Sequence, residues 1–210
     1  MKTIEQYILE KQNFLVKSHK QNVGDNVIQY EADEKLDVYK DDENVISHTF
    51  DNGVGVITFK NDVTEIKKGA FCNCSSLKSI NIPDSVTTIC ERAFCNCINL
   101  KSINIPNSVT TIEGLAFYGC NNLTFINISN SIEKIEQHVF TWCKNITSVT
   151  IPNSITTIGK FVFRECSKLQ EVKYEGTVEE WKNIKLGDSI FDNTKIGKIQ
   201  CTNGEVKYKK

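Results

Sequence analysis

The sequence predicts a stacked-repeat solenoid built mostly of short β-strands, and three observations support this prediction. Cysteine recurs every 23 residues, at Cys74, Cys97, Cys120, Cys143 and Cys166. Phenylalanine stands three residues before each of these cysteines, and isoleucine stands eight residues before. After the cysteines, polar and apolar residues alternate as in Ser79-Ile80-Asn81-Ile82, which is the pattern of a half-buried β-strand. A unit this short cannot bury its apolar face alone, so neighbouring units must stack.

The apolar positions after the cysteines define the class of solenoid. They are leucine or isoleucine, then two β-branched residues, and one unit follows the pattern I-x-x-x-A-F-x-x-C-x-x-L-x-x-I-x-I-P-x-S-V-x-x. A fixed period of about 20 to 29 residues with a leucine-rich core is typical of leucine-rich-repeat solenoids. The predicted fold is therefore an α/β-type leucine-rich-repeat solenoid, mostly β. We expect a curved, right-handed coil with a parallel sheet on its concave face, capped by hairpins and short helices.

The first predicted element is an amphipathic helix in residues 1–20. Thr3 and Gln6 have capping-box spacing, and Ile4, Ile8 and Leu15 lie on one apolar stripe. Two roles remain open for this helix. It packs on the N-terminal cap, or it serves self-association or docking to a partner.

Residues 21–62 are predicted to form an N-terminal cap of β-hairpins, because a solenoid must cover the end of its core. Asp51-Asn52-Gly53 has the composition of a tight hairpin turn. The alternating stretches expected to form strands are Asn26–Tyr30, Lys35–Tyr39, Val45–Phe50 and Val54–Phe59.

Residues 63–174 hold five repeats, and each is expected to contain two strands and a turn. Pro83 ends the first strand, since it cannot donate a ladder hydrogen bond. The β-branched Val86–Ile89 predicts a second short strand on the opposite wall. Ala70–Cys74 is too short for a full helix and is predicted to be a helical turn or 3₁₀ piece that carries Phe71 inward.

Residues 175–210 are predicted to form the C-terminal cap. Thr177 and Glu180 have capping-box spacing for a short helix that lays Trp181 over the last repeat. Thr202-Asn203-Gly204 then predicts a closing hairpin within Ile199–Tyr208.

The repeat motif resembles that of the BspA-like leucine-rich-repeat family over about residues 63 to 174. Ala93-Phe94, Cys97, Leu100, Ile103 and Ile105-Pro106 carry the resemblance in one unit, and five copies share its frame. The segment Tyr174–Ile184 also resembles the C-terminal boundary of this family. The resemblance implies a curved solenoid used for protein binding, often adhesion, with no catalytic residues and no cofactor.

Composition and charge exclude several classes of protein. The chain has 210 residues, 40% of them hydrophobic, and a formal net charge of -1, so bulk attraction to nucleic acid is not expected. No window approaches the roughly 20 apolar residues of a membrane helix. Glu5, Glu10 and Lys11 interrupt the start of the chain where an export signal would need an apolar core.

Nine cysteines, an odd number, fit a reducing compartment, so the protein is expected in the cytoplasm with its repeat thiols buried and reduced.

Three groups of residues raise the question of metal or catalytic chemistry. Cys72, Cys74, Cys95 and Cys97 form two C-x-C motifs one repeat apart, for which we weigh zinc binding against an inert thiol ladder and favour the ladder. Histidine occurs at three positions without a recurring Ser or Cys partner, so a catalytic triad is not expected. The acidic run 31–43 lacks EF-hand spacing and is predicted to be a solvated cap surface.

The strand alternation places two lanes of outward residues across the predicted concave sheet. The first lane is Ser79, Ser102, Phe125, Ser148 and Glu171, and the second is Asn81, Asn104, Asn127, Thr150 and Lys173. A large ring among small polar neighbours has the character of a binding hot spot. The alternative is that Phe125 packs along the sheet on Lys101 or on the unit of Ser148.

We therefore predict a non-catalytic module that binds a protein partner through these ten residues, without metal, cofactor, nucleic acid or membrane. Three alternatives are kept. They are a surface adhesin, a carbohydrate-active enzyme on a solenoid frame, and a structural or inhibitor protein of a phage or mobile element.

Overall fold

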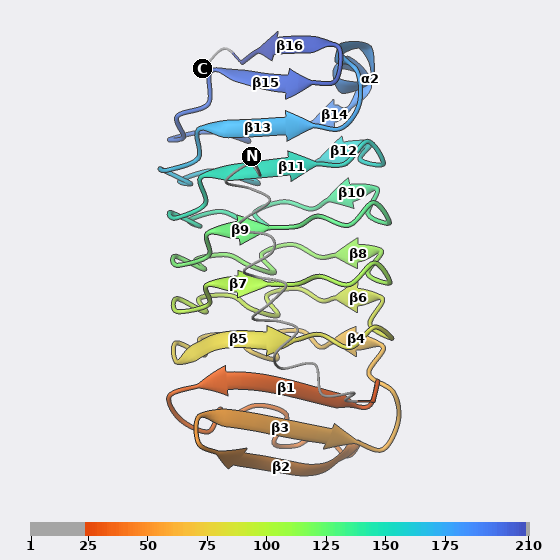
Figure 1. The fold of residues 1–210 in the computed structure, drawn as a ribbon, viewed down its shortest axis with the longest axis vertical. Helices are drawn as coiled ribbons and strands as arrows, with labels where there is room; N and C mark the ends of the chain where they lie inside the picture. The colour runs from red at the N-terminus through yellow and green to blue at the C-terminus, as the bar shows by residue number, and fades with distance from the viewer. Residues whose placement is uncertain (1–23, 209–210) are drawn as a thin grey trace, which may run out of the picture.

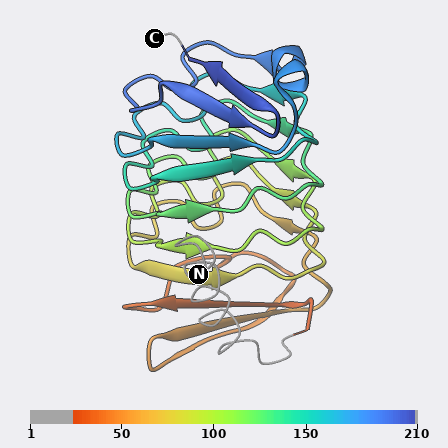
Figure 2. The ribbon, with the colours of Figure 1, turned by 45° about the horizontal axis from the view of Figure 1, so that its top comes forward.

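Successive turns of the chain stack along one axis, with β-hairpins at both ends of the stack (Figures 1 and 2). The structure is a computed structural model that describes residues 24–208. The helix predicted in residues 1–20, and the self-association predicted for it, lie outside the described residues. The predicted fold class is confirmed, because short parallel strands dominate and little helix is present.

One wall of the stack, here called the strand face, carries the strand that follows each cysteine. Its strands are β5 (Leu77–Asn81), β7 (Ser102–Ile103), β9 (Phe125–Ile126), β11 (Ser148–Ile151), β13 (Glu171–Tyr174) and β15 (Lys198–Cys201). The ladder is parallel and keeps the repeat register, with Ser102 opposite Phe125 and Ser148 opposite Glu171. The 23-residue spacing therefore sets which residues become neighbours on this wall.

The second wall is a six-stranded parallel sheet of very short strands. These are β4 (Glu65–Ile66), β6 (Thr88–Ile89), β8 (Thr111–Ile112), β10 (Lys134–Ile135), β12 (Thr157–Ile158) and β14 (Lys185–Leu186). The predicted second strand is thus confirmed, although only its last two residues pair. Every strand of this wall except β14 turns an isoleucine toward the core, and Ile89 is fully buried, whereas Leu186 of β14 is 45% exposed.

The third wall, here called the turn wall, corrects the prediction of a helical turn or 3₁₀ piece. It consists of residues 69–74 and the equivalent residues of each later turn. Gly69 and Asn73 have φ values of 64° and 64°, which no right-handed helix contains. Cys72 N donates to Gly69 O within the turn, whereas Asn73 N donates to Cys95 O of the next turn. The chain alternates between local turns and bonds to its neighbour, so the backbone groups are satisfied without a helix.

A column of phenylalanine rings runs through the centre of the stack. The rings of Phe71, Phe94, Phe117, Phe140, Phe163 and Phe191 stack with neighbouring centroids 5.3–5.6 Å apart, and all are at most 1% exposed. Tyr39 meets the first ring edge-on at 5.8 Å, and Tyr208 meets the last ring edge-on at 5.1 Å. Both ends of the column are thereby covered by an aromatic ring instead of water.

The N-terminal cap is an antiparallel sheet joined to the first repeat. It contains β1 (Val27–Ala32), β2 (Val45–Asp51) and β3 (Val54–Phe59), in the order β2-β3-β1-β5. The predicted turn at Asp51-Asn52-Gly53 is present, and positive φ values of 47° at Asn52 and 85° at Gly53 explain its sequence.

The predicted strand at Lys35–Tyr39 is wrong. This segment pairs with no strand, and it instead buries Leu36 and Val38 in the core. Tyr39 has a left-handed φ of 54° and packs edge-on against Phe59 at 5.2 Å. The apolar residues whose alternation indicated a strand therefore help to cover the end of the phenylalanine column.

The C-terminal region contains a sixth turn of the solenoid, where the sequence predicted only a cap. Phe191 follows Phe163 by 28 residues, five more than the repeat, because helix α2 (Val178–Asn183) is inserted before β14. The capping box at Thr177 is confirmed, with Glu180 N donating to Thr177 Oγ1 at 3.2 Å. Trp181 is buried and meets Tyr174 edge-on at 5.2 Å, as predicted.

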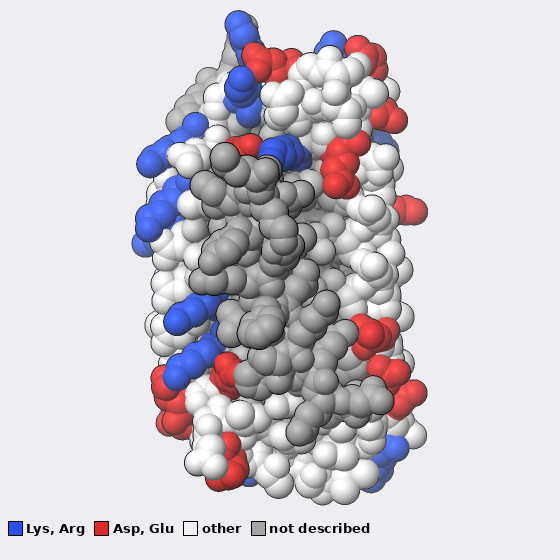
Figure 3. All heavy atoms as spheres, in the orientation of Figure 1, with Lys and Arg blue, Asp and Glu red and all other residues white. Residues whose placement is uncertain are grey.

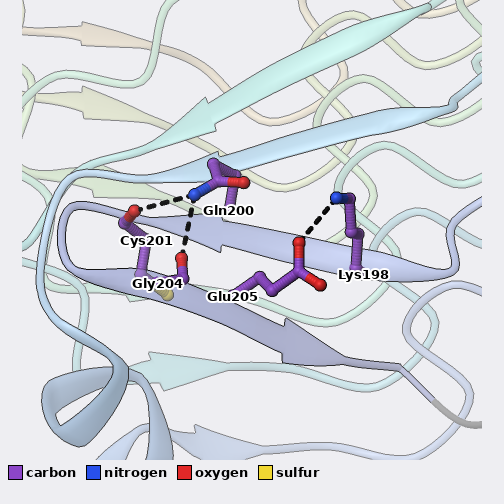
Figure 4. A network of polar contacts seen from close by, with 5 residues as sticks. All are labelled: Lys198, Gln200, Cys201, Gly204 and Glu205. Atoms are coloured by element: carbon purple, nitrogen blue, oxygen red, sulfur yellow. Dashed lines mark hydrogen bonds and ion pairs between the residues drawn. The ribbon is translucent and has the colours of Figure 1, made fainter.

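A hairpin closes the stack beyond the sixth turn. It pairs β15 with β16 (Gly204–Lys207), as the sequence predicts. Gln200 Nε2 donates to the carbonyl oxygens of Cys201 and Gly204 across the turn, at 3.2 and 2.9 Å (Figure 4). An ion pair between Lys198 and Glu205 joins the two strands beside it (Figure 4).

Candidate binding faces

The strand face presents the two predicted lanes toward the outside. None of their ten residues is buried, whereas the apolar residues between them, such as Ile80, Ile103 and Ile126, are 7% exposed or less. The predicted alternation is therefore confirmed along the whole array. The half-buried lane residues are Ser79, Asn81, Ser102, Phe125, Ser148, Thr150 and Lys173, and the exposed ones are Asn104, Asn127 and Glu171.

Ion pairs lie at the two ends of the strand face, and the exposed Lys101 precedes β7 between them. Lys173 and Glu171 on β13 form an ion pair at 3.5 Å, and Lys78 on β5 pairs with Asp33 of the N-terminal cap. The outward residues of β7, β9 and β11 are small neutral residues, apart from Phe125. In Figure 3, which views this side of the molecule, the Lys and Arg residues that can be seen lie mostly along one edge and the Asp and Glu residues mostly along the other. Apart from Lys101, the outward side chains of the central strands are hydrogen-bonding groups and one large ring.

Phe125 occupies the middle of the first lane. It begins β9, lies opposite Ser102 in the ladder, and precedes the fully buried Ile126. Its ring is half-buried, so it combines contact with the sheet and exposure to the outside. Serine fills this position in three other units. The fold therefore does not require an aromatic ring there.

The repeated cysteines form a buried ladder of hydrogen-bonded thiols, as predicted, except at its first member. Cys97 Sγ lies 3.0 Å from Phe71 O, and the equivalent contacts of Cys120, Cys143 and Cys166 are 3.1–3.2 Å. These four residues are fully buried, whereas Cys74 is half-buried. The prediction of five buried thiols is thus wrong for Cys74, because no repeat precedes it to supply a carbonyl oxygen.

Burial also controls the acidity of these thiols. It raises the pKa of the Cys74 thiol to about 11 and that of Cys166 to about 12, because the charged thiolate loses hydration inside the stack. A thiol held neutral in this way is a poor nucleophile. All nine cysteines of the chain are free, and the ladder thiols are donors within the core.

The outer pair of the C-x-C motifs lies on the turn wall. Cys72 is half-buried and Cys95 is buried. Burial raises the pKa of Cys95 to about 11. Within residues 24–208, no group of three or more His, Cys, Asp or Glu side chains is placed to hold a metal ion.

The two described histidines make structural contacts. His48 Nε2 lies 2.8 Å from the Tyr30 hydroxyl, and His138 Nδ1 lies 3.3 Å from Thr141 Oγ1. Burial lowers the pKa of both imidazoles, aided by Lys35 at His48 and by Arg164 at His138. His19 lies outside the described residues.

The acidic run of the cap is paired and not merely solvated. Asp37 bonds with Lys40 at 2.5 Å, and Asp42 bonds with Lys67 of the first repeat at 2.7 Å. The Asp42 side chain is only 7% exposed, and the hydrogen bond from Lys67 lowers the pKa of its carboxyl. The prediction of a solvated surface is therefore wrong for Asp42, which ties the cap to the array.

The sequence analysis missed a cluster of large side chains on the turn wall. Trp142 is 39% exposed, and the rings of His138 and Phe161 stack at 4.9 Å. Alignment of the 23-residue frame could have found them, because they occupy positions that other units fill with Gly69, Asn73 and Gly119.

The stacked turns and the walls just described define a repeat solenoid. This architecture is that of a leucine-rich-repeat protein, and the match to family models agrees with it. Models of the BspA type leucine rich repeat region match residues 47–144 and 88–209, in six copies. The chain belongs to the BspA-type leucine-rich-repeat family.

Solved structures of bacterial repeat proteins resemble this chain. A leucine-rich-repeat protein of Treponema pallidum is 30% identical, with a TM-score of 0.52 and 67% of each chain covered. A protein of Faecalibacterium prausnitzii, described as a leucine-rich cell surface protein, is 26% identical with a TM-score of 0.55. That match covers 76% of this chain and 46% of the other. No curated protein matches the chain.

The described residues contain no helix that is both long and apolar enough to span a membrane.

Proposed function

We propose that the protein is a non-catalytic interaction module that binds a protein partner through the strand face. The leucine-rich-repeat solenoid fold is typical of protein-interaction and surface modules, which gives the class of function. The observation that supports this face is Phe125, a half-exposed ring among small hydrogen-bonding side chains. Aromatic residues in such a setting tend to carry a large share of binding energy.

The lane residues provide specificity around the ring in this proposal. Asn104 and Asn127 are exposed amides that can both donate and accept hydrogen bonds. Glu171 and Lys173 lie at one end, where their ion pair would have to rearrange or remain at the rim of a contact. The proposed partner is a protein surface, and not nucleic acid or a membrane, because the lanes contain a single lysine, Lys173, and the chain has a formal net charge of -1.

The compartment proposed for this function is the cytoplasm. Nine free cysteines fit a reducing environment, in which thiols are not paired by oxidation. A second candidate is a module at the cell surface, which the similarity to the Faecalibacterium protein favours. Fractionation of the native cell, with the protein detected by antibody, separates the two.

Phe125→Ser tests the strand face. Partners captured by the wild-type protein from its native cell are identified, and calorimetry then measures the affinity of each variant for the purified partner. We expect Phe125→Ser to weaken binding by about 2 kcal/mol or more, since serine already fills this position in other units. Thr111→Ala, at an exposed position on β8 of the second wall, is the matched control and is expected to bind normally. Unaltered affinity of Phe125→Ser would reject the strand face as the binding site.

A further inference from the structure

The turn wall imposes a backbone conformation that favours glycine and asparagine. Two positions in each turn have positive φ. The first turn fills them with Gly69 (64°) and Asn73 (64°), and the second turn with Arg92 (58°) and Asn96 (57°). The third turn fills its second position with Gly119 (72°), where a Cβ would come within 2.4 Å of Asn96 Oδ1. Glycine carries no Cβ and asparagine tolerates the left-handed region, so the residues at the second position fit the backbone.

Later turns place large side chains at the same positions, against this preference. Leu115, His138 and Phe161 occupy the first position with φ values of 63°, 59° and 60°, and Trp142 occupies the second with 66°. A bulky residue in the left-handed region is uncommon, because its Cβ approaches the backbone carbonyl oxygen. Large side chains are common at the first position, whereas Trp142 follows Asn73, Asn96 and Gly119 at the second. Some other requirement must favour a tryptophan there.

Core packing does not supply that requirement. The interior of these turns is already filled by Phe117, Phe140 and Phe163, which are fully buried. Trp142 remains 39% exposed, and His138 and Phe161 are half-buried at the surface. Backbone conformations held against local preference tend to occur at functional sites.

Trp142, Phe161 and His138 form one cluster with two cations, which we call the aromatic turn cluster. Arg164 lies over the Phe161 ring at 5.3 Å, and the His138 ring stacks on the same ring at 4.9 Å. Lys144 Nζ lies 4.6 Å from the Trp142 ring centroid. The backbone joins the two halves of the cluster, since Trp142 N donates to Arg164 O at 2.9 Å.

The charges around the cluster indicate what it can bind. Lys160 on the same wall is paired with Asp188 at 2.8 Å, and Glu165 accepts a hydrogen bond from Asn193 at 2.6 Å. Arg164 and Lys144 instead lie on aromatic rings, which leaves guanidinium and ammonium hydrogens available to a ligand. A guanidinium held flat on a ring is well placed to bind a carboxylate.

The stacking also argues against a sugar as the ligand. Carbohydrates stack on a free aromatic face, but the Phe161 ring already contacts both His138 and Arg164, and Lys144 covers a face of Trp142. Ring edges and cationic groups are what the cluster presents. Exposed aromatic residues beside arginine have the composition of a protein-binding hot spot.

We propose that the aromatic turn cluster binds an acidic segment of a protein partner, in which carboxylates alternate with apolar side chains. Arg164 and Lys144 bind the carboxylates, while Trp142 and the edge of Phe161 contact the apolar side chains. This surface is separate from the strand face, and the proposal does not depend on binding at that face.

A fluorescence titration tests the proposal without knowledge of the partner. The probe is a short synthetic peptide that repeats Glu-Leu-Asp-Gly, and the control peptide repeats Gln-Leu-Asn-Gly. Trp142 is exposed whereas Trp181 is 3% exposed, so a change in tryptophan emission reports on the cluster. We expect a saturable change with the acidic peptide and at least about tenfold weaker binding in Arg164→Gln. Lys182→Gln on α2, an exposed cation outside the cluster, should bind as the wild type does.

Three outcomes would overturn the proposal: no saturable change, equal binding of the two peptides, or equal loss in Arg164→Gln and Lys182→Gln. A stability measurement separates binding from structure. Trp142→Gly should leave the melting temperature unchanged or raise it by a few degrees, because glycine relieves the left-handed backbone. A fall of more than about 4 °C would mean that the ring is retained for packing.

Discussion

The interior and the surface of this solenoid share the 23-residue spacing, but they differ in how strictly the residue at each position recurs. Inside, each turn repeats its residue, so that Phe94 stacks on Phe117 and Cys120 donates to the carbonyl of Phe94. Outside, Asn81, Asn104 and Asn127 also recur, but other positions change, and Phe125 lies beside Ser102. An inward side chain must fit the same side chain one turn away, whereas an outward one meets solvent or a partner. A large departure from the repeat is thus tolerated outside, and it marks a position open to function.

The largest expected effect comes from placing a charge at an inward position. Ile126 is fully buried between neighbouring turns, so Ile126→Asp would place an unpaired carboxylate in the core. Its cost of several kcal/mol is a large part of a typical stability of about 5 to 15 kcal/mol. We expect the array to unfold, as circular dichroism and urea titration would show.

The adjacent outward residue provides the control for this substitution. Asn127 is exposed on the strand face, and Asn127→Asp should cost under about 1 kcal/mol in the same titration. Equal losses at the two positions would contradict the alternation of inward and outward residues.

The same substitution, Phe→Ala, can be compared at an inward and an outward position. Phe117→Ala removes a ring from the middle of the column and should cost about 3–5 kcal/mol, because both neighbouring rings lose contact. Phe125→Ala removes the same group from the strand face and should cost under about 1 kcal/mol. Chemical denaturation of both variants measures the difference, and similar costs would show that Phe125 belongs to the packing of the sheet.

Alkaline pH should weaken the interior specifically. Burial raises the pKa of Cys166 to about 12 in the folded chain, above its ordinary value of 9.0. The folded state therefore holds its proton more tightly, and the stability from this difference is complete below about pH 9 and lost toward about pH 12. Unfolding free energy, measured by urea titration, should fall by about 1.4 kcal/mol per pH unit for this thiol across that window.

Cys166→Ala isolates this contribution from those of the other titrating groups. The variant should show a shallower decline between about pH 9 and pH 12 than the wild-type protein. Parallel curves would mean that Cys166 titrates equally in the folded and unfolded chains.

Most of the fold could be predicted because it depends on residues that recur in one frame. The positions of Phe117, Cys120 and Ile126 follow from the 23-residue spacing, and so do the outward lanes. The sixth turn escaped prediction because α2 shifts Phe191 out of that frame by five residues. Its ring nevertheless stacks on Phe163 at 5.6 Å, since the chain returns to the same register after the helix.

The ends of the array were harder to predict than its middle. Lys35–Tyr39 has the alternation of a strand, yet Tyr39 turns to cover Phe71. No periodic neighbour determines such a contact, which depends on how a distant segment closes over the column. The same applies to Asp42, whose burial depends on Lys67 in the first repeat.

The sequence by itself determined the repeat, the family, the two strand walls and the division of each strand into inward and outward residues. Those features depend on local periodicity and on identical neighbours one turn apart. The tertiary structure alone decided how the turn wall is built, which residues cap the phenylalanine column, and that Trp142, Phe161 and Arg164 lie together. Their placement depends on left-handed backbone positions and on contacts between turns, which no periodicity of apolar residues encodes.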